Sequence, residues 1–238
     1  GIEYLVFDKK ILTMEQLLHA CATNFEDEST TPTGKEIQMI MKNKVPKFGN
    51  DDDYADKWVV AIEEYVGHSL NHDYKSSKYG KGPVPCCFAY SQTPVTGNIS
   101  FGSRIGATPD GRSAGEPVNN GVSPANGSER NGATAACNSV AKIPTIYDQK
   151  GNIFNMRLAP STNQESRQKI LDMMRALFDK DAEQIQFNVV DNEVLKEAQK
   201  RPEDFPDLMV QVSGYSALFT SLGVACQNDV INRTEVEM

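Results

Sequence analysis

The 238-residue sequence has no long apolar run. Its densest short run, residues 58–62, is far shorter than the roughly 20 residues that a transmembrane helix needs. No basic segment is followed by an apolar one, so no secretory signal is visible. Positive charge is also in deficit, with 24 Lys and Arg against 32 Asp and Glu. This negative balance disfavours nucleic acid and membranes as main partners.

Cysteines are few and irregular. Their number, five, is odd, which indicates reduced thiols and a cytoplasmic location rather than a disulfide framework. Neither a Walker loop nor a dinucleotide fingerprint occurs. What is present, 39% hydrophobic residues with ordinary glycine and proline usage, suffices for a sizeable core. The sequence begins at Gly1 inside what reads as a running segment, so we expect a fragment or a processed piece of a longer protein.

The first third, residues 1–78, is expected to be a helical segment. A capping-box spacing at residues 13–16 predicts one helix, and a second is expected near residues 36–42. A third should run from residues 51–53 to about residue 70, because three aspartates suit a helix N-terminus. Its inward face is expected to consist of Trp58, Ala61, Ile62, Tyr65 and Val66.

Residues 79–205 are expected to supply strands, glycine- and proline-rich loops and crossover helices. The density of breakers up to residue 132 excludes long helices and predicts loops around short strands. Beyond it, helices and strands alternate, which indicates an α/β fold with crossover connections. The expected elements are helices over 164–178, 192–200 and 221–233 and strands over 184–190 and 208–213. The first of these helices should bury Ile170, Leu171, Met174, Leu177 and Phe178.

Two groups of side chains give only a weak signal for a metal site or a catalytic thiol. His68 and His72 have the spacing of a two-histidine metal face, with Asp73 adjacent, but no third ligand is evident, so a polar helix end is favoured. Cys86 and Cys87 are interpreted as buried thiols rather than catalytic thiolates, because no base stands beside them in sequence. We expect no bound metal.

The C-terminal region holds Val-Ser-Gly-Tyr at residues 212–215. Read locally, Gly214 is a strand-end turn that needs a positive φ. Read as chemistry, the segment resembles the loop of a glycyl radical enzyme, of the pyruvate formate-lyase-like superfamily. Other stretches resemble that family in the same order: Ala-Thr-Pro-Asp-Gly-Arg at 107–112, Gly-Val-Ser-Pro at 121–124, Asn-Gly-Ala-Thr-Ala at 131–135, Asn-Ser-Val-Ala-Lys at 138–142 and Gln-Asn-Asp-Val-Ile-Asn-Arg-Thr-Glu at 227–235.

The resemblance implies an α/β fold, the C-terminal part of a ten-stranded α/β barrel, with residues 206–238 as a glycyl radical domain. It implies a radical stored on Gly214 as the only cofactor, flanked by Ser213, Tyr215 and Gln211. A glycine suits this role because a planar Cα radical is delocalised over the flanking amide groups, and a Cβ would crowd that plane. Gln211 stands where the family pattern has an arginine.

The implied mechanism is a radical relay. An S-adenosylmethionine radical activating enzyme removes hydrogen from Gly214, the glycyl radical oxidises a cysteine to a thiyl, and the thiyl abstracts hydrogen from substrate. None of the five cysteines, Cys21, Cys86, Cys87, Cys137 and Cys226, lies in a matching loop. The implied partners are therefore the activating enzyme and an upstream part of the same enzyme that carries the cysteine loop. A homodimer and small accessory subunits are also expected.

Within the family, residues 92–100 and 119–126 most resemble the fumarate-adding alkyl- and arylalkylsuccinate synthases. Ser91, Gln92, Thr93 and Val95 are then candidates for the substrate pocket. The amide of Gln92 could hold a carboxylate and Val95 could form an apolar wall, although Gln92 could equally satisfy a neighbouring backbone group.

Besides fumarate addition, three alternative functions remain. One is a diol dehydratase, choline lyase or arylacetate decarboxylase of the same family, another is a stand-alone glycyl-radical repair subunit, and the last is a binding module without a radical. In all of them Asp110 and Arg112 are expected to form a structural turn, because Thr-Pro-Asp-Gly is turn chemistry that an arginine can tie to a carboxylate or carbonyl.

Overall fold

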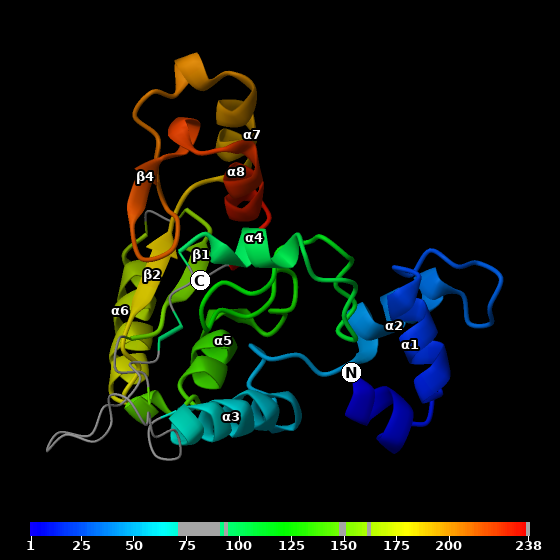
Figure 1. The fold of residues 1–238 in the computed structure, drawn as a ribbon. Coiled ribbons are helices and arrows are strands. Elements are labelled where there is room, and N and C mark those ends of the chain that lie inside the picture. Colours follow the sequence, from blue (N-terminus) through cyan, green and yellow to red (C-terminus); the bar gives the residue numbers. More distant parts are fainter. Residues whose placement is uncertain (71–90, 93–94, 148–150, 161–162, 237–238) are drawn as a thin grey trace, which may run out of the picture. The chain divides into compact units, whose positions relative to one another are not determined.

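The computed structural model describes residues 1–70, 91–92, 95–147, 151–160 and 163–236 (Figure 1). Contacts divide the chain into two compact units, one of residues 1–47 and 96–118 and the other of residues 48–95 and 119–238. The three segments expected from the sequence stay a prediction. In the described part of the chain, no helix combines the length and apolar character that a bilayer crossing requires.

The first unit is helical. It contains a π-helical turn, η1 (Glu3–Asp8), and helices α1 (Met14–Ala22), α2 (Gly34–Lys44) and α4 (Gly97–Gly102). The predicted capping box is confirmed, since the Thr13 side chain accepts the N–H of Gln16, and Thr33 and Glu36 form a second one. Its core consists of Leu5, Leu12, Leu17, Ala20, Phe25, Ile37, Met41 and Val45.

The second unit is built around a three-stranded parallel sheet in the order β2-β1-β5 (Figure 1). The strands are β1 (Phe154–Leu158), β2 (Ile185–Asn188) and β5 (Glu235–Val236), and α6 (Gln164–Phe178) forms the crossover from β1 to β2. A parallel pair needs such a crossover, because a tight hairpin cannot connect its ends. The expected helix over 164–178 and strand near 184–190 are thus confirmed, whereas β1 was not predicted.

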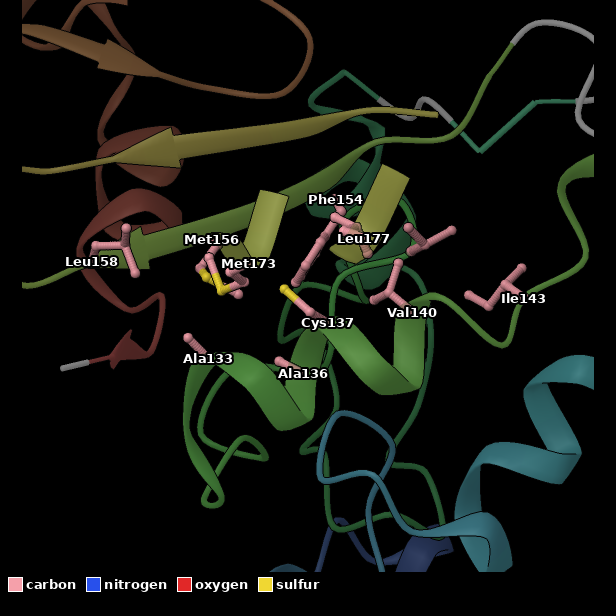
Figure 2. Close-up of a cluster of buried hydrophobic side chains, with 11 residues drawn as sticks. Ala133, Ala136, Cys137, Val140, Ile143, Phe154, Met156, Leu158, Met173 and Leu177 are labelled. Atoms are coloured by element: carbon pink, nitrogen blue, oxygen red, sulfur yellow. The ribbon is translucent and has the colours of Figure 1, made fainter. Parts of the chain in front are cut away.

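Strand β1 has one apolar and one polar face, because its side chains alternate across the sheet. Phe154, Met156 and Leu158 pack with Met173 and Leu177 of α6 and with α5 (Gly132–Val140), as Figure 2 shows. Asn155 and Arg157 point to the opposite face and are also buried. One face of β1 therefore supplies the core, and the other supplies polar side chains to the C-terminal segments.

The C-terminal part of this unit has its own core of Leu195, Ala198, Val210, Val212, Phe219 and Val230. It contains α7 (Asn192–Lys200), which matches the prediction, and an antiparallel hairpin of β3 (Met209–Gln211) and β4 (Ser216–Leu218). Helix α8 (Val224–Ile231) is shorter than the expected 221–233 because η5 (Phe219–Ser221) precedes it. The remaining short turns are η3 (Thr145–Tyr147) and η4 (Pro202–Asp204).

The short strands expected in the glycine-rich middle are not seen among its described residues. Between residues 95 and 132 these form loops and the short helix α4, and Gln92 makes an isolated parallel bridge to Asn152. The breakers do prevent long helices there, as predicted.

Helix α3 (Asp53–His68) buries a different face from the one predicted. Trp58 and Tyr65 are 51% and 75% exposed, while Asp56, Glu63 and Gly67 are buried. The reason is polar and steric: Asp56 binds Lys142 at 2.8 Å and Ser139 at 2.9 Å, and a Cβ on Gly67 would lie only 2.4 Å from Tyr147. An ion pair and a close contact, rather than apolar periodicity, orient this helix.

Helix α6 buries a narrower face than expected. Met173 and Leu177 lie in the core and Ile170 packs against it, whereas Leu171 and Phe178 are 48% and 42% exposed. We expect Leu177→Ala to lower the free energy of unfolding by about 2–5 kcal/mol, because it leaves a cavity against β1. Leu171→Ala, the matched control, should cost less than about 1 kcal/mol in the same chemical-unfolding measurement. Equal losses of unfolding free energy in the two variants would contradict this assignment of the buried face.

Glu129 links folding to pH. Burial raises its pKa from 4.5 to about 7, although a hydrogen bond from Thr234 partly opposes this. The folded protein then holds this proton more tightly than the unfolded chain, so the stabilisation is complete below about pH 4.5 and disappears as the pH rises toward 7. Thermal unfolding across this window should show the decline. It should be weaker in Glu129→Gln and unchanged in Glu64→Gln, at an exposed position of α3.

Candidate functional site

Gly214 lies in the four-residue turn that joins β3 to β4. The Val212 N–H donates to the Tyr215 carbonyl at 2.9 Å, which closes the turn. Gly214 has φ +80°, and a Cβ built on it would lie 2.9 Å from Cδ1 of Ile153. Both the backbone conformation and the close approach of Ile153 therefore favour glycine at this position. A residue without a Cβ is what a planar Cα radical also requires, so the loop fits that group.

Two side chains of β2 hold the loop. The Gly214 N–H donates to Oε1 of Gln186 at 2.9 Å. Asn188 binds Gln211 twice: its Oδ1 accepts the Gln211 N–H at 2.7 Å, and its Nδ2 donates to the Gln211 carbonyl at 2.6 Å. Gln186 and Asn188 are two residues apart, so they project from the same face of the strand.

The polar face of β1 and a preceding loop hold Ser213, which is 1% exposed. Its hydroxyl donates to Oδ1 of Asn120 at 2.6 Å, and Nδ2 of Asn155 donates to the same oxygen at 3.2 Å. The Asn155 N–H is itself fixed by Oγ of Ser123 at 2.9 Å. Ser213 is thus tied to β1 through a short buried chain of hydrogen bonds.

Arg233 holds the strand that leads into the loop. Its guanidinium, 8% exposed, donates to the carbonyls of Gln211 at 3.0 Å and Val212 at 2.6 Å, and to Oδ2 of Asp229 at 3.1 Å. Arg157 of β1 in turn donates to the carbonyl of Ile231 at 3.0 Å and binds Glu235. Two buried arginines therefore connect β1, the end of α8 and the loop.

The remaining predicted neighbours of Gly214 lie on the hairpin. The Gln211 side chain donates to Oγ of Ser216 at 2.8 Å, across the β3–β4 pair. Tyr215 is 39% exposed, and its partial burial, with a smaller effect from Cys226, raises its pKa. The position at which the family pattern has an arginine is thus occupied here by a neutral side chain that binds its own hairpin.

No described thiol is activated as a thiolate. Burial raises the pKa of Cys137 to about 12 and also raises those of Cys21 and Cys226, with smaller contributions from Asp110 and Asp229 respectively. Cys86, Cys87, His72 and Asp73 lie outside the described residues, and His68 is exposed near the end of α3. Among the residues that the structure describes, no three metal-binding side chains are grouped.

The substrate-pocket candidates are only partly described. Gln92 is half-buried, and its amide donates to Oε2 of Glu63 at 2.5 Å. Its carbonyl accepts the Ile153 N–H at 3.3 Å, so Ile153 lies between Gln92 and Gly214. Ser91 is half-buried and Val95 is 48% exposed, while Thr93 lies outside the described residues. Substrate contact by these residues stays a prediction.

Asp110 and Arg112 lie in a tight turn of the first unit. Oδ1 of Asp110 accepts the Thr108 hydroxyl at 2.5 Å and the Arg112 N–H at 3.2 Å. The Arg112 guanidinium donates to the carbonyls of Ser113 and Glu116 at 3.1 and 2.6 Å, and to those of Ile105 and Gly106. The arginine thus binds carbonyls rather than a carboxylate.

Sequence reasoning located Gly214 but assigned no role to Gln186, Asn188, Asn120, Asn155 or Arg233. A signal was present for β2, because the alternation in residues 184–190 places its polar side chains on one face. For β1, the alternation Phe-Asn-Met-Arg-Leu at residues 154–158 carried the same information. Arg233 lay within a segment recognised as similar to the family, without a stated function.

Replacing Arg233 should loosen the loop. We expect Arg233→Met to lower the free energy of unfolding by about 3–5 kcal/mol, because Asp229 stays buried without its arginine. The matched control is Arg175→Met on α6, which removes an exposed Arg–Asp pair and should cost less than about 1 kcal/mol. Chemical unfolding compares the two, and limited proteolysis should cut residues 211–216 faster in the Arg233 variant only. Equal small losses would refute the role assigned to Arg233.

Comparison with known proteins covers nearly the whole chain. The family described as Glycine radical matches residues 118–220, and the family described as Pyruvate formate lyase-like matches residues 1–97. Trans-4-hydroxy-L-proline dehydratase of Clostridioides difficile is 40% identical over 99% of this chain and 28% of its own length. The 4-hydroxyphenylacetate decarboxylase glycyl radical subunit of the same species is 33% identical over 100% of this chain and 27% of its own.

Among solved structures, the glycerol-bound B12-independent glycerol dehydratase from Clostridium butyricum matches with a TM-score of 0.88 and 37% identity, over 100% of this chain and 29% of its own. The chain thus spans less than a third of the length of these relatives. Their common fold confirms the expected class, a part of the α/β barrel of glycyl radical enzymes. Along nearly its whole length, the chain is similar to glycyl radical enzymes of the pyruvate formate-lyase-like superfamily.

Proposed function

We propose that this chain is the radical-storing C-terminal part of a glycyl radical dehydratase that acts on a small hydroxylated substrate. The observation that carries the proposal is the match of the whole chain to a dehydratase structure at a TM-score of 0.88, together with 40% identity to a second dehydratase. These relatives favour the alternative of a dehydratase or decarboxylase over hydrocarbon addition to fumarate, the branch first expected.

Gly214 is proposed as the radical site. In support, its loop has a positive φ, and a Cβ on Gly214 would require Cδ1 of Ile153 to shift. Val212 and Ser213, the two residues before Gly214, are buried. Arg233 binds the Val212 carbonyl, and the Ser213 hydroxyl binds Asn120. Gly214 itself is exposed in this structure, so these contacts support the proposal by fixing the geometry of the loop.

The proposed reaction follows the relay that the family implies. A radical S-adenosylmethionine activating enzyme removes one hydrogen atom from Cα of Gly214, and the resulting radical takes a hydrogen atom from a cysteine thiol. The thiyl then abstracts a hydrogen atom from a substrate carbon. The neighbouring C–O bond breaks, and the hydroxyl leaves as water with a proton that the heteroatom on the radical carbon releases. The product radical takes the hydrogen atom back from the thiol. The described thiols lie in none of the expected cysteine loops, so this thiol is proposed to lie in the part of the enzyme beyond this chain.

The substrate class is tested with the complete native protein. After anaerobic activation, it is incubated with 1,2-propanediol, glycerol and trans-4-hydroxy-L-proline, and separately with 4-hydroxyphenylacetate and with fumarate plus a hydrocarbon. Loss of water from a hydroxylated compound, followed by NMR, supports the proposal. Carbon dioxide release, or a succinate adduct, from the other mixtures with no dehydration would refute it.

The radical site is tested by substitution. In the activated native protein, electron paramagnetic resonance should show a doublet from the remaining Cα hydrogen of Gly214, and oxygen should cleave the chain there. Gly214→Ala should abolish both signals. Gly223→Ala is the matched control, because Gly223 has negative φ and no atom within 4 Å of a built Cβ. A doublet that survives in Gly214→Ala would place the radical elsewhere.

A further inference from the structure

We propose that Gln186 is the side chain that binds and electronically supports the radical residue, an inference that rests on Gly214 as the proposed radical site. The observation is direct: Oε1 of Gln186 accepts the N–H of Gly214 at 2.9 Å. This N–H belongs to one of the two amide groups over which a Cα radical is delocalised. Gln186 therefore touches the reacting unit itself.

The position of Gln186 is fixed by the sheet. It lies within β2, paired in parallel with Asn155 of β1, and residues on both sides of it are also paired. Two residues later on the same face, Asn188 makes two hydrogen bonds to Gln211, three residues before Gly214. One strand face thus holds the loop at two points, and the second restricts how far Gly214 can move from Gln186.

The other loop contacts act on different residues. Arg233 binds the carbonyls of Gln211 and Val212, and Asn120 binds the hydroxyl of Ser213. These contacts position the chain that leads to Gly214, whereas Gln186 binds the Gly214 amide. Ile153 supplies an apolar contact from β1's side, at the place where a Cβ would stand. Gly214 is therefore bound by the polar side chain of Gln186 and has the apolar side chain of Ile153 nearby.

The hydrogen bond has a chemical consequence. An acceptor on an N–H polarises the amide and increases electron density on its nitrogen. A nitrogen that donates electron density stabilises a neighbouring Cα radical, which the carbonyl on the other side stabilises by withdrawal. An anionic acceptor forms the stronger hydrogen bond. Radical lifetime should therefore follow the acceptor at position 186 in the order carboxylate, amide, none.

The test uses the complete native protein with three variants. Gln186→Met removes the acceptor at similar size, and Gln186→Glu keeps an acceptor oxygen. Gln168→Met is the matched control, since this glutamine is exposed on α6 and its amide binds Asp172 at 2.9 Å. Circular dichroism establishes folding. Hydrogen–deuterium exchange with mass spectrometry, before activation, measures protection of the Gly214 N–H. Electron–nuclear double resonance after activation measures the coupling of that proton, and the anaerobic decay of the doublet gives the half-life.

Gln186→Met should expose the Gly214 N–H to exchange, change its proton coupling and shorten the radical half-life roughly two- to tenfold, the scale of one net hydrogen bond. Gln186→Glu should keep the protection and give a longer half-life than that of the unaltered protein, because the carboxylate is the stronger acceptor. Gln168→Met should change none of these. Unaltered protection, coupling and half-life in Gln186→Met would overturn the inference.

If Gln186→Met does not fold, Gln186→Glu decides: retained protection with a shortened half-life, or lost protection with an unchanged half-life, overturns the inference. The proposed function fails differently, namely if the activated unaltered protein shows no doublet or if Gly214→Ala retains one. Exchange protection of the Gly214 N–H is measured without any radical, so the two failures are distinguishable.

Discussion

The C-terminal part of the structure depends on a charge buried inside a strand. Arg157 of β1 is 2% exposed, and a charge so placed needs a partner. Its two terminal nitrogens have partners, whereas its Nε has none among the described residues. Arg157 binds the carbonyl of Ile231 and the carboxylate of Glu235, which fixes the chain on both sides of Arg233. Arg233 then binds the carbonyls that lead to Gly214. The polar face of β1 thus fixes the geometry of the glycine loop, first through Arg157 and then through Arg233.

Much of the local structure could be predicted from the sequence. Helices α6 and α7 have the predicted bounds, because each combines an N-terminal capping side chain with clear amphipathic spacing. The orientation of α3 could not be predicted in this way. Its apolar stripe is the exposed side, because the pairing of Asp56 with Lys142, 86 residues away, decides the buried face. Periodicity reports the most apolar face, and here a distant charge outweighs it.

The same limit applies to the site. Gly214 was predicted as the radical site because Val-Ser-Gly-Tyr at residues 212–215, a short local segment, resembles the loop of glycyl radical enzymes. Gln186, Asn188 and Arg233 were not assigned, since their partners lie 28, 23 and 22 residues away in sequence. Alternation places Gln186 and Asn188 on one face of a strand, but the packing of the hairpin determines that this face meets the loop. The reaction type within the family likewise does not follow from local motifs.

The order of these contacts along the chain has a consequence for biosynthesis. Gln186 and Asn188 leave the ribosome before Gly214, but Arg233 and Glu235 leave after it, and both are needed to fix the loop. While Gly214 emerges, its turn is held from one side only. The loop therefore reaches its final geometry only after β5 has left the ribosome and paired with β1. A nascent chain that has not yet released Arg233 and Glu235 therefore lacks two of the contacts that fix the glycine loop.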